Sequence, residues 1–299
     1  MSRYRRRLAV CCVALLAVGI LSLALLNARA DSDVLVVGCK NFTESRLLAA
    51  LMARTIRDST GLPVEVRELG STTLCFDALR TRAIHIYPEY TGTLLVEILR
   101  GPSVTDPGRA LDEARRRASQ QFQMEVLEPF GFNNTYVLAM RGDRARQLEV
   151  QTLSDLTRHP ELQAGFTSEF LQRSDGYPGL AAHYGLRFRR SPVDLAPGHM
   201  YGAVRGGQVD LISAFSTDFR LDLFGLTALE DDRGFFPAYQ AVPLVRRATL
   251  ERYPALKPAL ARLKGRIDDQ AMRELNRQAD QHRDPVNLVA ARFLQRLTP

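Results

Sequence analysis

Aromatic residues stand where several predicted strands and loops end. Tyr90 lies within IYPEYTGT, Tyr136 follows NNT, Phe215 precedes STD, and Tyr239 follows FFPA. Any one of these rings could simply pack in a core or on the surface. Rings gathered at one cleft would instead suit a quaternary ammonium group. Such a group has no N–H to donate, and π faces recognise it at about 0.5–2 kcal/mol each.

Few other residues in the chain suggest chemistry. Lys40 and Arg173 lie in predicted turns that lead into helices, where either could be exposed to solvent. The sequence holds no G-x-S-x-G, no G-x-x-x-x-G-K and no G-x-G-x-x-G after a strand, so the usual enzyme signatures are missing. An acid–base pair assembled from distant residues stays as the alternative. The histidines form no i,i+4 pair and no C-x-x-C follows residue 30, so neither a metal site nor a cofactor is expected.

The elements that must position these side chains alternate between strand and helix. Strands are expected at 34–38, 64–66 and 84–86, with helices between them. Asn41 is expected to cap the first helix together with Glu44, three residues later. This alternation is typical of an α/β fold with a parallel sheet.

An internal echo suggests that the α/β unit occurs twice. ALRTRAIHI at 78–86 and AVRGGQVDL at 203–211 share a register 125 residues apart, and each is followed by an aromatic residue, Tyr90 or Phe215. The match is short, so it is weak when taken alone. It fits two lobes that each present a ring at the carboxyl end of an equivalent strand, where open α/β sheets bind ligands.

The predicted organisation follows from this echo. Residues 31–140 form the first part of lobe 1, residues 141–238 form lobe 2, and residues 239–299 return to lobe 1. Two strand-like segments, 135–140 and 239–245, are expected to cross between the lobes. They would form a hinge beneath a ligand cleft.

The first 30 residues have the three parts of a secretory signal. An arginine cluster is followed by an apolar run from Leu8 to Leu26 and by Ala28-Arg29-Ala30, which predicts cleavage after Ala30 and an exported, periplasmic protein. An uncleaved membrane anchor is the alternative. These residues carry five arginines and no acid, so the net charge of +7 falls to +2 for the remainder. The high pI is therefore no argument for nucleic-acid binding.

Two cysteines remain beyond the predicted signal, Cys39 and Cys75. Each follows a predicted strand near the start of a helix. An exported protein meets an oxidising compartment, where a disulfide can persist. The sequence leaves two interpretations open, a Cys39–Cys75 disulfide and a pair of buried thiols.

Several long stretches resemble one family of binding proteins. They are VGCKNFTES at 37–45, IYPEYTGT at 86–93, FGFNNTYVLAMR at 130–141, GFTSEFLQRSDGYPGL at 165–180, QVDLISAFSTD at 208–218 and LEDDRGFFPAYQAVPLVR at 229–246. These are similar to the substrate-binding proteins of glycine betaine/choline/proline-betaine ABC importers, the OpuAC-like family. The resemblance implies a type II periplasmic-binding-protein fold, in which two α/β lobes are joined by two crossover strands.

The resemblance also implies a set of ligand-binding residues. An aromatic cage around a trimethylammonium head would be formed by Tyr90, Tyr136, Phe215 and Tyr239. The polar positions that match the family are Lys40, Thr73, Thr93, Asn134 and Arg173. In betaine binders of this type the lysine, the threonine of TGT and the arginine hold the carboxylate. Thr73 stands where some choline-preferring relatives carry an acid.

Two positions depart from the family pattern. Phe215 replaces the usual tyrosine, which keeps the π face and loses the hydroxyl, and Cys39 replaces a serine. Lys40 and Arg173 would lack partners if choline were bound, and unpaired cations in a closed cleft are costly. Glycine betaine or proline betaine is therefore expected first and choline second.

The resemblance implies partners as well as a ligand. An ABC permease with its ATPase is expected to receive the closed, liganded protein, which is expected to be a monomer. Two alternatives use the same cleft for a small zwitterion: a two-lobed enzyme, and a sensor that signals the closed state to another protein.

Overall fold

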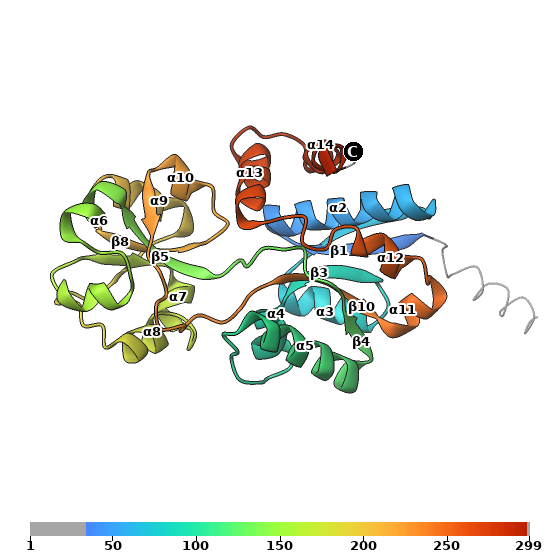
Figure 1. Ribbon diagram of the computed structural model, residues 1–299, viewed down its shortest axis with the longest axis horizontal. Coiled ribbons are helices and arrows are strands. Elements are labelled where there is room, and N and C mark those ends of the chain that lie inside the picture. The colour runs from blue at the N-terminus through green and yellow to red at the C-terminus, as the bar shows by residue number, and fades with distance from the viewer. Residues whose placement is uncertain (1–33, 298–299) are drawn as a thin grey trace, which may run out of the picture.

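The computed structural model describes residues 34–297, and the signal segment predicted at 1–30 lies outside them. In the described part of the chain, no helix has the length and apolar character needed to cross a membrane. The described residues form two lobes, each built on its own five-stranded sheet (Figure 1).

Lobe 1 is built on a sheet in the order β2-β1-β3-β10-β4. Its strands are β1 Leu35–Lys40, β2 Val64–Gly70, β3 Ile86–Tyr90, β4 Met124–Val126 and β10 Ala241–Arg246. Strands β2, β1 and β3 are parallel, whereas β10 runs antiparallel to both β3 and β4. All six residues of β1 are buried, as expected for a strand covered on both faces.

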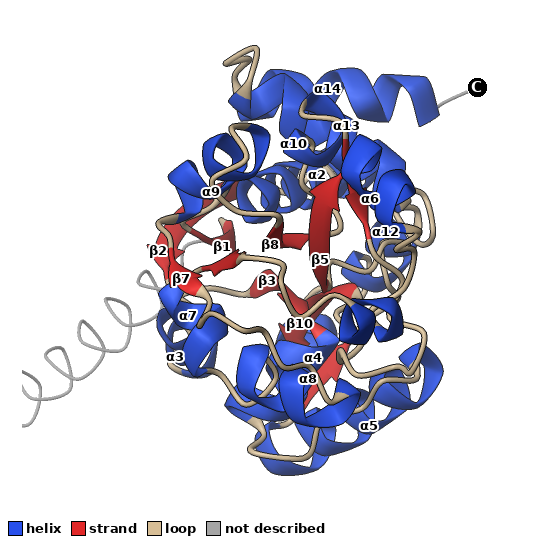
Figure 2. Cartoon of the chain, turned by 90° about the vertical axis from the view of Figure 1, so that its left-hand side faces the viewer, coloured by secondary structure: helices blue, strands red, loops and turns tan. Residues whose placement is uncertain are grey.

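Helices cover both faces of this sheet. The helices of lobe 1 are α2 Thr43–Thr60, α3 Thr72–Arg80, α4 Thr91–Thr93, the π-helical turn η1 Leu94–Ile98, α5 Pro107–Phe122, α11 Arg247–Arg252, α12 Leu256–Ala261, α13 Asp269–Asp280 and α14 Val286–Leu297. One core joins the sheet to α2, α12, α13 and α14, and a second joins it to α3, η1 and α5. The helices can be followed on the two sides of the strands in Figures 1 and 2.

Lobe 2 repeats this arrangement with the strand order β7-β6-β8-β5-β9. Its strands are β5 Tyr136–Arg141, β6 Ala164–Phe166, β7 Val193–Asp194, β8 Leu211–Phe215 and β9 Leu226–Ala228. Its helices are α6 Gly142–Leu148, the 3-10 turn η2 Ser154–Arg158, α7 Ser168–Gln172, α8 Tyr177–Tyr184, α9 Pro197–Arg205 and α10 Arg220–Leu223. Here too the three strands β7, β6 and β8 are parallel and β5 is antiparallel.

The internal echo corresponds to a real structural repeat. The amides of Ala83 and Ile84 both bond to the carbonyl of Ala78, and the amides of Gln208 and Val209 both bond to that of Ala203. Each copy thus joins a helix to the middle strand of its sheet, α3 to β3 and α9 to β8. The predicted parallel pairing holds for three strands of each sheet, and an antiparallel strand follows the middle strand in both lobes.

The lobes meet at two crossing segments that bond to each other. Asn133 forms a bridge with Gln240, the amide of Asn134 bonds to the carbonyl of Tyr239, and the Tyr239 amide bonds to Asn133 Oδ1. The strand β5, at 136–141, pairs with β8 and β9, so it belongs to lobe 2. Lobe 1 therefore ends before residue 136 rather than at the predicted residue 140.

Cys39 and Cys75 are both buried free thiols. Cys39 packs with α2 in one core of lobe 1, and Cys75 packs in the core on the opposite face of the sheet. Burial raises the pKa of Cys39 to about 11 and that of Cys75 to about 12. Of the two interpretations left open by the sequence, the structure supports a pair of buried thiols, because the two side chains lie on opposite faces of the sheet.

Candidate functional site

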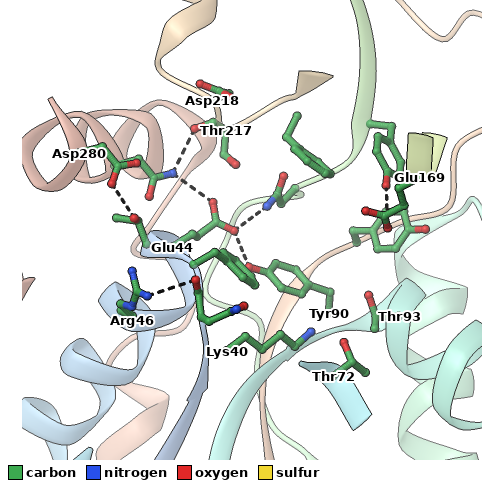
Figure 3. Close-up of a pocket in the computed structure, with 18 of the residues that line it drawn as sticks. Lys40, Glu44, Arg46, Thr72, Tyr90, Thr93, Glu169, Thr217, Asp218 and Asp280 are labelled. Atoms are coloured by element: carbon green, nitrogen blue, oxygen red, sulfur yellow. Dashed lines mark hydrogen bonds between the residues drawn. The ribbon is translucent and has the colours of Figure 1, made fainter. Parts of the chain in front are cut away.

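A cavity of about 570 Å³ lies between the lobes. Both lobes and the crossing segments line it, as Figure 3 shows in part. The predicted ligand residues found in its lining are Lys40, Tyr90, Thr93, Asn134, Tyr136, Arg173, Phe215 and Tyr239. Thr73 is exposed and is not part of the lining, where its neighbour Thr72 stands instead. The first turn of α3 directs Thr72, and not Thr73, into the cavity.

Lobe 2 contributes two stacked rings. Tyr136 begins β5 and Phe215 ends β8, and the two are partners in the antiparallel register. Their ring centroids lie 4.7 Å apart at an interplanar angle of 30°. Phe170 lies behind Tyr136, at 5.0 Å between centroids. Phe215 keeps 44% of its surface exposed, so its outer face is available to a ligand.

Lobe 1 contributes Tyr90 at the end of β3. Phe42 stacks on this ring with centroids 6.4 Å apart, and the Lys40 ammonium lies 5.3 Å from its centroid. Phe42 also lines the cavity. It lies within the motif KNFTES, where the sequence alone does not distinguish a ring that lines a cavity from one exposed at the surface.

Tyr239 reaches the cavity from the second crossing segment. Its hydroxyl donates to Asp175 Oδ2 at 2.5 Å, which joins this segment to lobe 2. A Cβ at Gly92 would lie 2.6 Å from the Tyr239 ring, so the glycine of TGT is required for the close approach of α4 to this tyrosine. Burial and the Asp175 carboxylate raise the pKa of Tyr239, which therefore stays protonated.

Lys40 already has a carboxylate partner within the protein. Its ammonium lies 2.5 Å from Glu89 Oε1, and both side chains are almost fully buried. Glu89 also accepts hydrogen bonds from the hydroxyl of Tyr87 and from the amide of Tyr90. The expectation that Lys40 lacks a partner without a ligand carboxylate was therefore wrong.

Arg173 is paired as well. Its guanidinium forms two bonds of 2.7 Å with Asp175, one of 2.8 Å with Glu97 in lobe 1, and a longer one of 3.3 Å with Glu169. Hydrogen bonds from Arg173 and Tyr239 outweigh burial and keep the pKa of Asp175 below its ordinary value. Because Lys40 and Arg173 both have carboxylate partners within the protein, unpaired cations give no reason to expect betaines before choline.

Glu44 does not have the capping role that its spacing from Asn41 predicts. The residue before α2 is Phe42 and no side chain caps the helix, so Asn41 and Glu44 do not form the predicted cap. Glu44 is instead buried at the cavity, where the Tyr90 hydroxyl donates to it at 2.6 Å (Figure 3). Asn134 Nδ2 donates to the same carboxyl at 2.7 Å. Burial raises the pKa of this carboxyl despite these hydrogen bonds.

Other acids line the same cavity. They are Glu97, Glu169, Asp218 and Asp280, and the basic residues beside them are Arg46 and Arg220. Sequence reasoning missed them because they come from separate segments with no common motif. Within residues 34–297, no group of three or more histidine, cysteine or acidic side chains is arranged to hold a metal ion.

One known protein family matches nearly all of the described residues. The family described as the substrate-binding domain of ABC-type glycine betaine transport systems matches residues 33–296. This chain belongs to that family. The family consists of transport binding proteins and not of enzymes, as the sequence predicted, and its members work with an ABC permease and ATPase.

Individual relatives agree with this assignment. OpuCC, a carnitine transport binding protein of Listeria monocytogenes, is 33% identical over 271 residues, which cover 89% of this chain and 87% of the relative. A glycine-betaine-binding protein of Pseudomonas aeruginosa is 33% identical over 312 residues, with 99% and 95% covered. The solved structure of a glycine betaine/carnitine/choline ABC transporter protein superposes with a TM-score of 0.82 at 29% identity and covers 88% of this chain and 98% of its own. The type II periplasmic-binding-protein fold predicted from the sequence is confirmed.

Proposed function

We propose that this substrate-binding component of an ABC importer captures a zwitterionic quaternary ammonium compound, with its trimethylammonium head between Tyr90, Tyr136, Phe215 and Tyr239. The observation that carries the proposal is that rings from lobe 1, lobe 2 and a crossing segment line one cavity. Aromatic faces are the groups that recognise a cation without N–H donors. A ligand held by rings of both lobes also favours their closure.

The names of the relatives support a ligand with a carboxylate. Glycine betaine and carnitine, named for two of them, each carry a trimethylammonium and a carboxylate. Arg173 is the donor best placed for that carboxylate, because 23% of its side chain is still exposed, whereas Lys40 is 7% exposed. Thr72 and Thr93 supply hydroxyls in the same lining. The ligand carboxylate would share Arg173 with Asp175 and Glu97 rather than fill a vacancy.

We also propose that the protein is exported by its first 30 residues and acts as a monomer that docks on the permease when it is liganded. Glycine betaine, proline betaine, carnitine and choline are the compounds to test, by isothermal titration calorimetry on the purified protein. Saturable binding of at least one of them is expected, with 1:1 stoichiometry. Failure of all four to bind would refute the ligand class.

A further inference from the structure

Three carboxylates surround the guanidinium of Arg173. Its Nε and Nη2 atoms donate to the two oxygens of Asp175, each at 2.7 Å. Its Nη1 atom donates to Glu97 at 2.8 Å and to Glu169 at 3.3 Å. Arg173, Glu97 and Glu169 all line the cavity. One positive charge thus faces three negative ones, so this cluster is not a free anion site.

The donors of Arg173 are nearly all in use. A guanidinium has five N–H groups, one on Nε and two on each Nη atom. Asp175 accepts from Nε and from one N–H of Nη2, while Glu97 and Glu169 accept from Nη1. Within residues 34–297, these contacts leave one N–H of Nη2. A carboxylate that binds an arginine in the paired form needs two parallel N–H groups. A ligand carboxylate therefore has to take Nη1 from one of the two glutamates.

Glu97 is the stronger competitor for Nη1. Its bond to Arg173 is 0.5 Å shorter than that of Glu169, as the distances of 2.8 and 3.3 Å give. The Glu97 side chain is also less exposed, at 39% against 64%, so water screens its contact less. Glu97 belongs to η1 of lobe 1 and Arg173 follows α7 of lobe 2, so the same contact spans the cavity between the lobes.

We propose that Glu97 is a specificity-determining residue, because it occupies on Arg173 the position that a ligand carboxylate takes. This inference rests on the proposed function and deepens it. A zwitterion must replace Glu97 at Nη1 and brings a further negative charge to Arg173, which opposes its binding. A ligand with the same trimethylammonium head and no carboxylate leaves the contact intact, and the surplus negative charge attracts it. Glu97 thus shifts the preference of the site away from zwitterions and toward simple cations.

The test compares ligands that have the same shape and differ in charge. Glycine betaine and its primary amide form one pair, and carnitine and its primary amide form another. In each pair the amide replaces one carboxylate oxygen by NH₂ and removes the negative charge. The measured quantity is the Kd of the carboxylate divided by the Kd of its amide, from calorimetry on the purified protein. Effects on lobe closure act on both members of a pair, so they cancel in this ratio.

Glu97→Gln is the deciding variant. A neutral amide oxygen is a weaker acceptor than a carboxylate, so a ligand carboxylate displaces it from Arg173 more easily. The ratio should fall about three- to tenfold in both pairs, because the contact is charge-assisted and partly exposed. Glu169→Gln should lower the ratio less, since its bond to Nη1 is longer and its side chain is more exposed. A general loss of structure would raise both Kd values and would not produce this fall.

Glu128→Gln is the matched control. Glu128 pairs with Arg115 at 2.9 Å and its side chain is 39% exposed, so the pair resembles that of Glu97 and Arg173 in distance and exposure. Glu128 also belongs to lobe 1, but it is not part of the cavity lining. Its substitution removes the same charge from the protein and should leave the ratio unchanged.

The outcomes separate this inference from the function on which it rests. If both pairs and the four test compounds all fail to bind, the proposed function is wrong and the inference falls with it. If the ligands bind and Glu97→Gln keeps the native ratio, the cage stands and competition by Glu97 is refuted. An equal rise of both Kd values in Glu97→Gln would mean that Glu97 only joins the lobes. An equal fall of the ratio in Glu128→Gln would mean that net charge, and not contact with Arg173, sets the preference.

Discussion

Phe215 is the one phenylalanine of the proposed cage, whose other three rings are tyrosines. Its ring stacks on Tyr136 by one face and exposes the other to the cavity. Phe215→Ala should raise the Kd for the best ligand about two- to thirtyfold, the range that corresponds to one cation–π contact. Phe215→Tyr keeps the π face and should stay within about twofold of the native Kd. Calorimetry measures both.

Leu223 provides the control for this prediction. It is a large exposed apolar residue of lobe 2, like Phe215, but it is not part of the cavity lining. Leu223→Ala should leave the Kd unchanged. An equal loss in Leu223→Ala and Phe215→Ala would mean that the Phe215 effect reflects lobe stability and not contact with the ligand.

Glu44 should make stability depend on pH. Burial raises its pKa in the folded state, so the folded protein holds this proton more tightly than the unfolded chain does. The stabilisation is therefore fully present below about pH 4.3, the ordinary glutamate value, and is lost as pH rises through the raised pKa. Relative to Glu44→Gln, the free energy of unfolding of the native protein should fall by up to about 1.4 kcal/mol for each unit by which pH rises in that window.

Urea unfolding of both proteins at a series of pH values measures this difference. The comparison with Glu44→Gln cancels the other carboxyl groups, which titrate in both proteins. A difference in free energy of unfolding that is constant from pH 4 to pH 8 would contradict the raised pKa.

At the scale of elements, the junction of β3 and α4 sets the position of Tyr239 in the second crossing segment. A Cβ at Gly92 would lie 2.6 Å from the Tyr239 ring and 2.9 Å from the carbonyl of Ala238. Because backbone cannot yield as a side-chain tip does, Gly92→Ala should displace Tyr239 from the cavity. We expect at least about a tenfold rise in Kd, since such a shift spoils the geometry of contact in a packed site.

Gly202→Ala is the matched control for Gly92→Ala. Gly202 lies within α9, and a Cβ there would meet nothing within 4 Å. This variant should bind as the native protein does and should be slightly more stable, because alanine is the better helix former by about 1 kcal/mol. Native affinity in Gly92→Ala would show that the ring of Tyr239 is not needed.

At the scale of the whole molecule, much of the fold could be predicted because it depends on local pattern. Strand–helix alternation and the internal echo that begins at residues 78 and 203 were enough to predict two similar lobes. The backbone hydrogen bonds to the carbonyls of Ala78 and Ala203 are equivalent, as the echo predicts. The boundary between the first part of lobe 1 and lobe 2 was predicted too late in the chain, because the sequence of β5 is that of an ordinary half-buried strand. Only its pairing with β8 assigns it to lobe 2.

The residues of the site could be predicted only where they lie within a recognisable motif. The rings and Arg173 lie in long family-like stretches, and the cavity brings them together. The partners of the cations were not predictable, because Glu97 is 76 residues from Arg173 and Glu89 is 49 from Lys40. The spacing of Glu44 from Asn41 satisfies the capping-box pattern and therefore predicts a helix cap. The burial of the Glu44 side chain depends instead on contact with Asn276 of α13, which is 232 residues away.

The two lobes have separate hydrophobic cores, which has a consequence for the liganded protein. Residues of lobe 1 pack in two clusters and those of lobe 2 in two others, and an ion pair between Arg173 and Glu97 is one of the links between them. A ligand held by both lobes binds only when both are folded. At one hundred times its Kd it should therefore add about 2.7 kcal/mol to the free energy of unfolding.

Differential scanning calorimetry with and without ligand tests this for each lobe. Tyr90→Ala removes a ring of lobe 1 and Phe215→Ala one of lobe 2, and at a fixed ligand concentration both should reduce the rise in Tm, while Leu223→Ala should retain it. The reason is that stabilisation depends on the ratio of ligand concentration to Kd, and each variant raises Kd. If only the lobe 1 variant reduced the rise, the ligand would be held by one lobe, and a cage closed between two lobes would be refuted.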